Sequence, residues 1–541
     1  MKKPIAIILS AALLLMTLMT LTACGSTTAT AASEETAAAT ESSAVSTDDM
    51  PDETLEGNLP GDPPDGNGGP GGTPPGDPPD GNGGPGGTPP GDPPDGNGGP
   101  GGTPPGEPPD GNGGPGGTPP GGFGGGMPGG GPGGSSADID YTGAAEIRSA
   151  DSQSGQTYAS TTADESALLI STADEVSITD PTVTKSGDSD GGDNCNFYGL
   201  NAAVLVKDGT TATITGGTIT SDAEGANGVF CYGGNGGQNG ATGDGTTLYI
   251  HDTAITTTGN GSGGIMTTGG GITYAYDLTV ETSGRSSAAI RTDRGGGTVV
   301  VDGGSYTSNG LGSPAIYSTA DITVSNAKLV SNLSEGVCIE GLNSITLNDC
   351  DLTANNTQCN GNATFLDTIM IYQSMSGDAA SGTSHFTMNG GTLTSKNGHV
   401  FHVTNTNAVI SLKGVEIVNE DADNILLSVC ADGWSGGSNI ATLKAIAQKL
   451  FGAIKVGSDS SLTLELTDGS SFEGSIDGSI TNAKGETVSS EVGTVSVTLD
   501  GTSTWTLTGD SYVTEFHGDA ANIISNGYTL YVNGVALTGT K

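Results

Sequence analysis

Arginine is rare in this chain and is concentrated in one place. Three of the four arginines, Arg285, Arg291 and Arg294, lie within ten residues of one another, in a sequence with 60 acidic and 16 basic residues and a formal net charge of −44. A guanidinium group presents a planar fork of donors that matches carboxylates and hydroxyl groups. Because Asp293 stands between two of these arginines, the stretch supports two interpretations: an internal ion pair, or part of a ligand-binding face.

A second group of residues that could do chemistry is the acidic run 186–199, SGDSDGGDNCNFYG. Carboxylate oxygens are ligands that Ca²⁺ prefers, so Asp188, Asp190 and Asp193 are candidate calcium ligands. The run lacks the glycine spacing and the terminal Glu of an EF-hand, and the alternative is an acidic loop in solvent. Calcium is the one cofactor that the sequence suggests.

The five histidines are scattered, and none lies in a signature of a Ser or Cys nucleophile. His399 and His402 are three residues apart in a stretch with the composition of a strand, which predicts that they point to opposite faces. We therefore predict neither a catalytic triad nor a metal site built on this pair, and we assign no catalytic residue.

The elements that must position these residues are short β-branched segments separated by Gly, Asn and Asp, beginning near Ala137. Seven such segments align, at NAAVLV, NGVFCY, GGIMTT, AAIRTD, PAIYST, EGVCIE and DTIMIY. Their anchor residues are Val204, Val229, Ile265, Ile290, Ile316, Val337 and Ile369, with steps of 25, 36, 25, 26, 21 and 32 residues. Several segments are followed by two more short strands, and three strands in each short repeat predict an all-β solenoid, a parallel β-helix.

Alternation along each strand divides the aligned segments into an inward column, which holds the anchor residues, and an outward column. We predict that the outward column is exposed; it reads Leu205, Phe230, Met266, Arg291, Tyr317, Cys338, Met370 and His402. Because adjacent coils lie about 4.8 Å apart, Tyr317 should lie beside Arg291. The candidate ligand-binding residues on this face are Tyr232, Arg291, Asp293, Arg294, Tyr317, Glu340 and Tyr372. Insertions at 186–199, 233–245, 355–366 and 374–384 flank the same column, as expected for loops around a binding site.

Two further features have local interpretations. The stretch 441–456, ATLKAIAQKLFGAIKV, has helical spacing of its apolar residues but also reads as two strands split near Gly452; we expect strands, with a short capping helix as the alternative. The six cysteines that follow Cys24 show no metal-binding spacing. Six cysteines in so long a chain do not make a disulfide scaffold, and we expect most of them to be small buried hydrophobic side chains.

The turns ITGGTITS, VDGGSYTS and MNGGTLTS resemble those of right-handed β-helix proteins of the pectate-lyase type. The C-terminal GTVSVTLDGTSTWTLTGDSYVTEFHG is similar to passenger segments of autotransporter adhesins, although no translocator barrel follows it. The chain also resembles calcium-dependent polysaccharide-binding β-helix proteins in its build. These resemblances imply a right-handed parallel β-helix and an adhesin-like or polysaccharide-binding role. The lyase resemblance would imply an Arg base, Arg291 or Arg294, beside bound calcium.

The N-terminal quarter differs in amino-acid composition and has three successive parts. Residues 1–23 read as a lipoprotein signal peptide, and LTACG resembles a lipobox that would place a diacyl group on Cys24. Residues 24–60 form a Ser/Thr/Ala-rich linker expected to be disordered. Residues 61–136 contain four copies of a 15-residue Pro/Gly-rich repeat, expected to form a stalk, and 137–541 form the β-helix domain.

Together these features predict an exported, lipid-anchored, surface-exposed protein that binds polysaccharide through the outer face of a β-helix. The acidic composition argues against nucleic acid as a partner. We expect a binding protein rather than an enzyme. The alternatives are a calcium-dependent polysaccharide lyase or hydrolase of the pectate-lyase type, and a structural or protein-binding surface scaffold.

Overall fold

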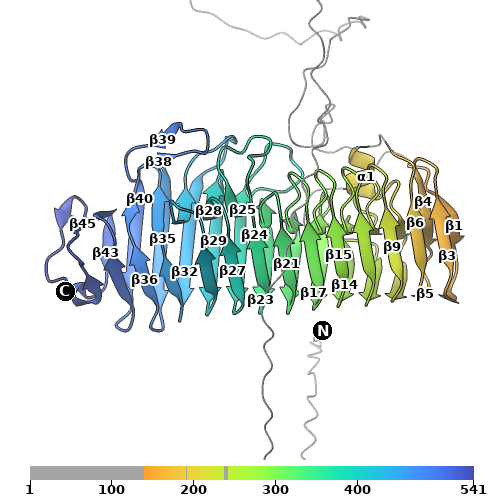
Figure 1. Ribbon diagram of the computed structural model, residues 1–541, viewed down its shortest axis with the longest axis horizontal. Helices are drawn as coiled ribbons and strands as arrows, with labels where there is room; N and C mark the ends of the chain where they lie inside the picture. The colour runs from red at the N-terminus through yellow and green to blue at the C-terminus, as the bar shows by residue number, and fades with distance from the viewer. Residues whose placement is uncertain (1–138, 190–191, 237–241) are drawn as a thin grey trace, which may run out of the picture. The chain divides into compact units, whose positions relative to one another are not determined.

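The computed structural model describes residues 139–189, 192–236 and 242–541. In Figure 1 the strands stand side by side in chain order, from β1 (Thr142–Ile147, orange) to β45 (Leu530–Val532, blue). Nearly all of them pair in parallel with the equivalent strand of the next coil. The described part of the chain is therefore a right-handed parallel β-helix, as the sequence predicts. The predicted signal peptide, Cys24, the predicted linker and the Pro/Gly repeats lie outside the described residues.

Three long parallel sheets form the sides of the helix, and their strands recur once in each coil. Sheet I has 13 strands: β1 (Thr142–Ile147), β4 (Glu165–Ser171), β7 (Val204–Lys207), β10 (Val229–Tyr232), β13 (Ile265–Thr268), β16 (Ile290–Thr292), β19 (Ile316–Ser318), β22 (Val337–Glu340), β25 (Asp367–Tyr372), β28 (His399–Thr404), β31 (Ile425–Val429), β34 (Ala453–Val456) and β37 (Ile476–Asp477). Sheet II has 14: β2 (Asp151–Ser154), β5 (Glu175–Thr179), β8 (Thr211–Thr215), β11 (Thr247–His251), β14 (Gly271–Tyr276), β17 (Gly297–Asp302), β20 (Asp321–Ser325), β23 (Ser344–Asn348), β26 (Thr383–Asn389), β29 (Thr406–Lys413), β32 (Asn439–Ile446), β35 (Ser460–Thr467), β40 (Thr494–Leu499) and β43 (Glu515–His517). Sheet III has 10: β3 (Thr157–Ser160), β6 (Thr182–Lys185), β9 (Thr218–Ser221), β12 (Ala254–Thr257), β15 (Thr279–Thr282), β18 (Ser305–Ser308), β21 (Lys328–Ser331), β24 (Asp351–Ala354), β27 (Thr392–Ser395) and β30 (Glu416–Asn419).

Shorter elements complete the described part. Sheet IV contains β33 (Lys449–Phe451), β36 (Ser471–Gly474), β41 (Thr504–Leu507) and β44 (Ile523–Ile524). An antiparallel hairpin joins β38 (Ile480–Thr481) and β39 (Thr487–Ser489), and a C-terminal sheet holds β42 (Ser511–Val513), β45 (Leu530–Val532) and β46 (Val535–Ala536). The described helices are α1 (Asp193–Tyr198) and one turn of 3₁₀-helix at Ala520–Asn522. No helix of the described residues is long and apolar enough to cross a membrane.

The corner between sheets II and III explains the repeated Gly-Gly, Asp and Asn turns. At this corner the backbone adopts positive φ, for example 51° at Asp277, 78° at Gly303 and 56° at Asn326. Gly enters this region freely, and Asp and Asn do so more readily than other residues. A Cβ on Gly304 would lie 2.4 Å from the carbonyl oxygen of Leu278 in the coil before, so the close approach of neighbouring coils also requires glycine at this position.

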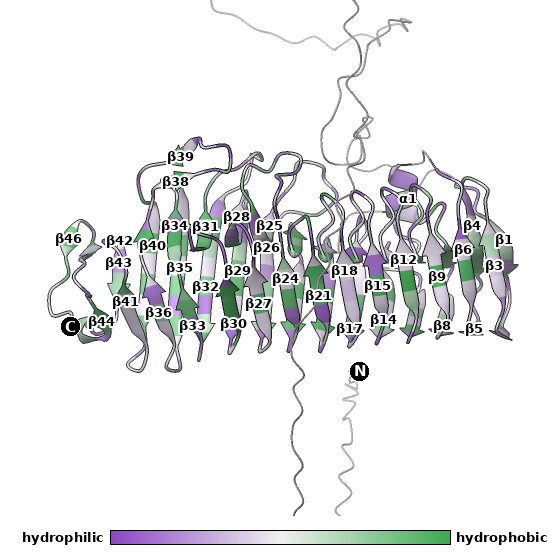
Figure 2. Cartoon of the chain, viewed as in Figure 1, coloured by the Kyte–Doolittle hydropathy of each residue, from purple (hydrophilic) through white to green (hydrophobic). Residues whose placement is uncertain are grey.

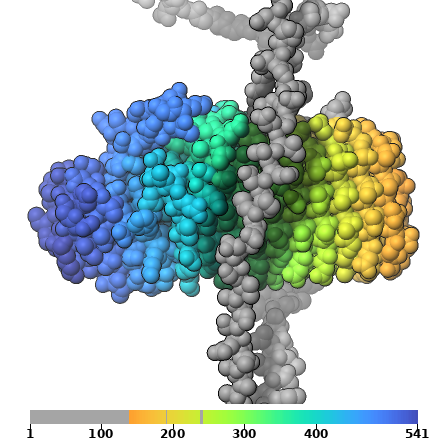
Figure 3. All heavy atoms as spheres, in the orientation of Figure 1, coloured from red at the N-terminus to blue at the C-terminus, as the bar shows by residue number. Residues whose placement is uncertain are grey.

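The core confirms the predicted inward column. Val204, Val229, Ile265, Ile290, Ile316, Val337 and Ile369 are successive Cα partners in sheet I, and each is buried. Figure 2 shows green bands alternating with pale and purple ones along the strands, and Figure 3 shows the coils as successive bands of colour. The stacked aliphatic side chains supply the hydrophobic stabilisation, at about 1.5–3 kcal/mol for each large side chain fully buried.

The ambiguous stretch 441–456 is strand, as expected. Residues 441–446 belong to β32, and β33 and β34 follow, with turns at Ala447–Gln448 and Gly452. The coil therefore breaks at two points instead of the single point that the sequence suggested. Of the six described cysteines, all except Cys359 are buried, which confirms the burial predicted for most of them.

Candidate functional site

The predicted outward column exists, but it is covered. Leu205, Phe230, Met266, Arg291, Tyr317, Cys338, Met370 and His402 are successive partners in sheet I. Most of these side chains are buried, so the prediction that the column is exposed is wrong. Three apolar clusters cover the outer face of sheet I. Phe197 and Tyr198 of the insertion 186–199 belong to the first, Trp434 packs against the second, and Phe365 of the insertion 355–366 lies in the third with Ile480.

The cluster nearest the N-terminal end of sheet I is formed with α1. Phe197 and Tyr198 of α1 pack against Leu205, Phe230 and neighbouring side chains. Tyr232 belongs to this cluster, with its ring centroid 5.8 Å from that of Tyr198. Tyr232 is thus part of the apolar cluster, which Arg294 also contacts through Phe197.

Arg291 forms a buried ion pair with Asp293. Its Nη2 lies 2.6 Å from Asp293 Oδ2, and its Nη1 donates to Asn196 Oδ1 and to the carbonyl oxygen of Ser286. The guanidinium carbon lies 5.8 Å from the ring centroid of Tyr317, as the coil spacing predicted. Burial raises the pKa of Asp293 to about 7, although the Arg291 guanidinium acts in the opposite direction. This is the internal ion pair that the sequence offered as one interpretation.

Arg294 joins two insertions instead of facing solvent. Its Nη2 lies 2.5 Å from Asp378 Oδ1, and its guanidinium lies 4.2 Å from the ring centroid of Phe197. Asp378 belongs to the insertion 374–384 and Phe197 to α1. Arg294 therefore ties both insertions to the end of β16 through an ion pair and a cation–π contact.

The Glu340 carboxylate accepts hydrogen bonds from the remaining candidates, Tyr317 and Tyr372. Tyr317 donates to Glu340 Oε2 at 2.6 Å and Tyr372 donates to the same oxygen at 3.3 Å, while Ser374 donates to Oε1. Burial raises the pKa of Glu340, and the hydrogen bonds to its carboxylate act against that rise. Trp434 packs against Tyr372, at 4.9 Å between centroids. The hydrogen-bonding capacity of the Glu340 carboxylate is thus used by Tyr317, Tyr372 and Ser374.

Of the candidate calcium ligands, Asp188 and Asp193 lie in the described part of the chain, where each has a separate structural role. Asp188 Oδ1 accepts from the backbone N–H of Glu224, Asp193 begins α1, and Asp190 lies outside the described residues. The buried ammonium of Lys185 lies in the same region and donates to the carbonyl oxygens of Thr162, Ser186 and Gly187. In the described ranges no group of three or more His, Cys, Asp or Glu side chains is arranged to hold a metal ion.

Two of the histidines, His399 and His402, form a cluster that the sequence did not predict. His399 Nδ1 and His402 Nδ1 each lie 2.7 Å from Ser428 Oγ, and His402 Nε2 lies 3.5 Å from Asp432 Oδ2. The prediction that the two rings point away from each other is therefore wrong, and a Ser, a His and an Asp are adjacent where no triad was expected. Ser428 and His402 have no exposed surface, and Phe365 packs against both imidazole rings. The aligned segments of the sequence ended at DTIMIY, before β28 and β31, and so did not signal this cluster.

A partly exposed aromatic group lies on a different side of the helix, on the outer face of sheet II. Tyr249 of β11 pairs with Tyr274 of β14, and His251 pairs with Tyr276. The rings stack at 5.0 Å and 11° in the first pair and at 4.6 Å and 7° in the second. All four side chains are half-buried. We call these four residues the aromatic platform.

The stacking fixes which ring faces are open. Each ring turns one face to its partner in the next coil, so the free faces point along the helix, away from the pair. On one side the neighbours are Thr213 and Thr215 of β8, and on the other they are Val300 and Asp302 of β17. These shorter side chains leave a step at each edge of the platform. The alternating aromatics of TLYIH and ITYAY were the available signal in the sequence.

The class of protein that this architecture defines is the right-handed parallel β-helix. Comparison of the chain with protein-family models, with curated proteins and with solved structures gives no match. The fold is compatible with adhesin-like and with pectate-lyase-like proteins, and it does not choose a function by itself.

Proposed function

We propose that this protein binds polysaccharide at the cell surface through the outer face of its β-helix, and that the aromatic platform is the binding site. The observation that carries the proposal is the pair of ring stacks on a rigid sheet, with free ring faces above short neighbours. Binding sites for small ligands combine aromatic surfaces with a few polar groups that fix orientation. A pyranose ring has a flat C–H face that fits against a tyrosine ring at such a step.

Polar groups next to the platform match the hydroxyl groups of a sugar. Asp302 accompanies Tyr276 on the β17 side, and Thr213 and Thr215 accompany Tyr249 and His251 on the β8 side. The net charge of −44 repels polyanions. We therefore expect a neutral or cationic glycan rather than a pectate-like one.

The residues first chosen as ligand-binding are better explained as supports. Arg291, Asp293, Arg294, Glu340 and Tyr317 use their polar groups on one another or on the insertions above sheet I. Such pairing leaves them few donors and acceptors for a ligand. The surface location and the lipid at Cys24 belong to the same proposal and are supported by the N-terminal sequence alone.

A glycan array with the mature protein tests the proposal, followed by titration of each positive glycan. We expect Tyr274→Ala and Tyr276→Ala to weaken binding about three- to tenfold each, because each removes a stacking surface. Tyr274→Phe and Tyr276→Phe should retain most of the affinity. Tyr512→Ala is the matched control, since Tyr512 forms a stacked pair with Tyr531 far along the chain.

Two results would contradict this assignment. Unchanged affinity in both alanine variants would remove the platform as the site, and no binding to any glycan would favour the scaffold alternative. An ultraviolet assay for unsaturated uronate products, run with calcium and with EDTA, tests the lyase alternative. Product release that requires calcium would replace binding with catalysis as the function.

A further inference from the structure

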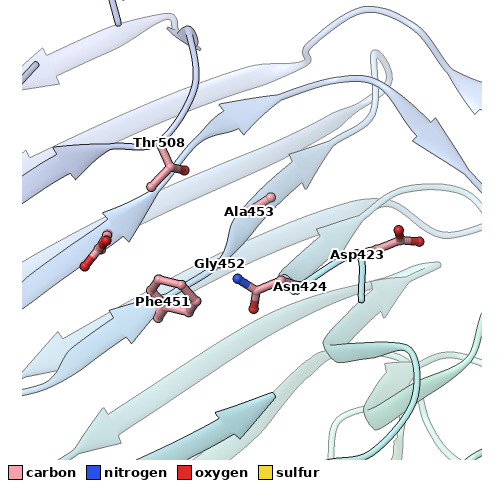
Figure 4. A pocket seen from close by; sticks show the side chains of 7 residues that line it. Asp423, Asn424, Phe451, Gly452, Ala453 and Thr508 are labelled. Carbon is pink, nitrogen blue, oxygen red and sulfur yellow. The ribbon is translucent and has the colours of Figure 1, made fainter. Parts of the chain in front are cut away.

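A shallow pocket lies where sheet IV meets sheet I, outside every site discussed above. It is lined by Asp423, Asn424, Phe451, Gly452, Ala453, Glu473 and Thr508. Figure 4 shows the Phe451 ring at one side, with Asn424 and Asp423 extending from the preceding coil and Thr508 beyond. Phe451 is 52% exposed, which is unusual for an aromatic side chain on a strand.

The backbone at this corner creates the pocket. Gly452 joins β33 to β34 with a φ of 113°, and a Cβ there would lie 2.6 Å from the carbonyl oxygen of Asn424. The floor is thus formed by a residue without a side chain. Glu473 is the direct partner of Phe451 in sheet IV, so a carboxylate and an aromatic ring stand side by side on the outer face.

Among the described residues, the two carboxylates of the pocket have no cationic partner. Asp423 and Glu473 form no ion pair within the described ranges, whereas nearby Asp477 is paired with Lys455 at 2.8 Å. Asn424 Oδ1 is buried and has no hydrogen-bond partner in the described structure. Lys449 lies two residues before Phe451 on the same strand and forms no ion pair with Glu473.

We propose that this pocket binds the ammonium group of an amino sugar. An ammonium carries three donors and no acceptor, and it is attracted to the face of an aromatic ring and to carboxylates. Phe451 supplies the ring, and the exposed carboxylates of Glu473 and Asp423 supply the charges. The inference rests on the proposed function in taking the ligand to be a glycan, and it adds the chemical class: a polysaccharide with free amines.

The experiment compares two probes that differ in charge, chitosan oligomers (glucosamine chains) and chitin oligomers (their N-acetylated counterparts). Binding to the mature protein is measured by calorimetry at mildly acidic pH, where the sugar amine is protonated and exposed carboxylates are ionised. We expect chitosan oligomers to bind about five- to tenfold more tightly than chitin oligomers of equal length. Phe451→Ala and Glu473→Gln should each reduce this preference to about twofold or less. Tyr528→Ala is the control, because Tyr528 is 43% exposed elsewhere.

The outcomes separate this inference from the proposal on which it rests. Equal binding of both oligomers, or a chitosan preference that survives Phe451→Ala and Glu473→Gln, would overturn the ammonium site and leave the platform untouched. A preference lost in those two variants but retained in Tyr274→Ala would support it. If neither oligomer nor any neutral glycan binds, the proposed function itself fails.

Discussion

At the scale of single residues, the segments that fold over sheet I determine which of its outward side chains are buried. The repeat placed Tyr317 beside Arg291, and the two are in contact. Burial of Arg291 and Asp293 could not be predicted, because it depends on how α1 and the insertion 374–384 fold over sheet I. The paths of these insertions follow no period. The contact between His402 and Ser428 joins direct partners on adjacent strands of sheet I, and it was missed because the aligned segments ended at DTIMIY, before these strands.

The Arg291–Asp293 pair predicts how the free energy of unfolding depends on pH. Burial raises the pKa of Asp293 to about 7, well above the value of about 3.9 of an unfolded chain. The folded protein therefore holds this proton more tightly, and the resulting stabilisation is complete below about pH 4 and is lost as the pH rises through about 7. We expect the free energy of unfolding to fall, relative to Asp293→Asn, by on the order of 3 kcal/mol across this interval.

Urea denaturation of both proteins at several pH values measures the difference. Asp459→Asn, at an exposed position, controls for the loss of one negative charge. A wild-type advantage that grows as the pH rises would contradict the prediction. It would mean that Arg291 keeps the carboxylate ionised and its pKa below the unfolded value.

At the scale of elements, the sheets were predictable because each strand repeats a short code. Aliphatic residues alternate along it, and Gly, Asp or Asn follows at the corner. Serine adds a second periodic contact: Ser262 N donates to Ser287 Oγ, and Ser287 N donates to Ser313 Oγ, both at 2.9 Å. The change from sheet III to sheet IV could not be predicted in this way, since it occurs where the repeat is interrupted.

That interruption is bridged by one side chain. Strand β33 follows β30 in the stack, but the two belong to different sheets. Gln448 is buried between them; its Oε1 accepts from the N–H of Val415 at 2.7 Å, and its Nε2 donates to the carbonyl oxygen of Val415 at 2.8 Å. The amide thus replaces one rung of backbone pairing.

We expect Gln448→Ala to destabilise the protein by about 2–4 kcal/mol, because it leaves two buried backbone groups without partners. Urea denaturation measures the loss, and hydrogen exchange at the Val415 amide should accelerate more than exchange in sheet II. Gln156→Ala, at an exposed glutamine, should change stability by less than about 0.5 kcal/mol. Equal effects of the two substitutions would show that the bridge contributes nothing.

At the scale of the whole molecule, the sequence predicted the start of the solenoid near Ala137, and the described helix has its first strand at Thr142. It did not predict which side would carry an open surface. Sheet II alternates buried apolar side chains with polar or aromatic ones that stay partly exposed. The outward column of sheet I is instead largely apolar, for example at Leu205, Phe230 and Met370, and these side chains are covered. The aromatic platform lies on the sheet whose outward side chains remain partly exposed.

The N-terminal sequence and the binding face make one joint prediction about function in the cell. If Cys24 carries the lipid, Cys24→Ala should move the protein from the membrane fraction to the medium and abolish incorporation of labelled fatty acid.

Residues 61–136 would span on the order of 200 Å if fully extended, enough to carry the platform away from the membrane. Deleting residues 61–120 should therefore leave the glycan affinity of the purified protein unchanged while reducing attachment of whole cells to glycan-coated beads. Equal attachment of cells with and without the repeats would contradict their role as a spacer, and continued lipid incorporation in Cys24→Ala would contradict the anchor.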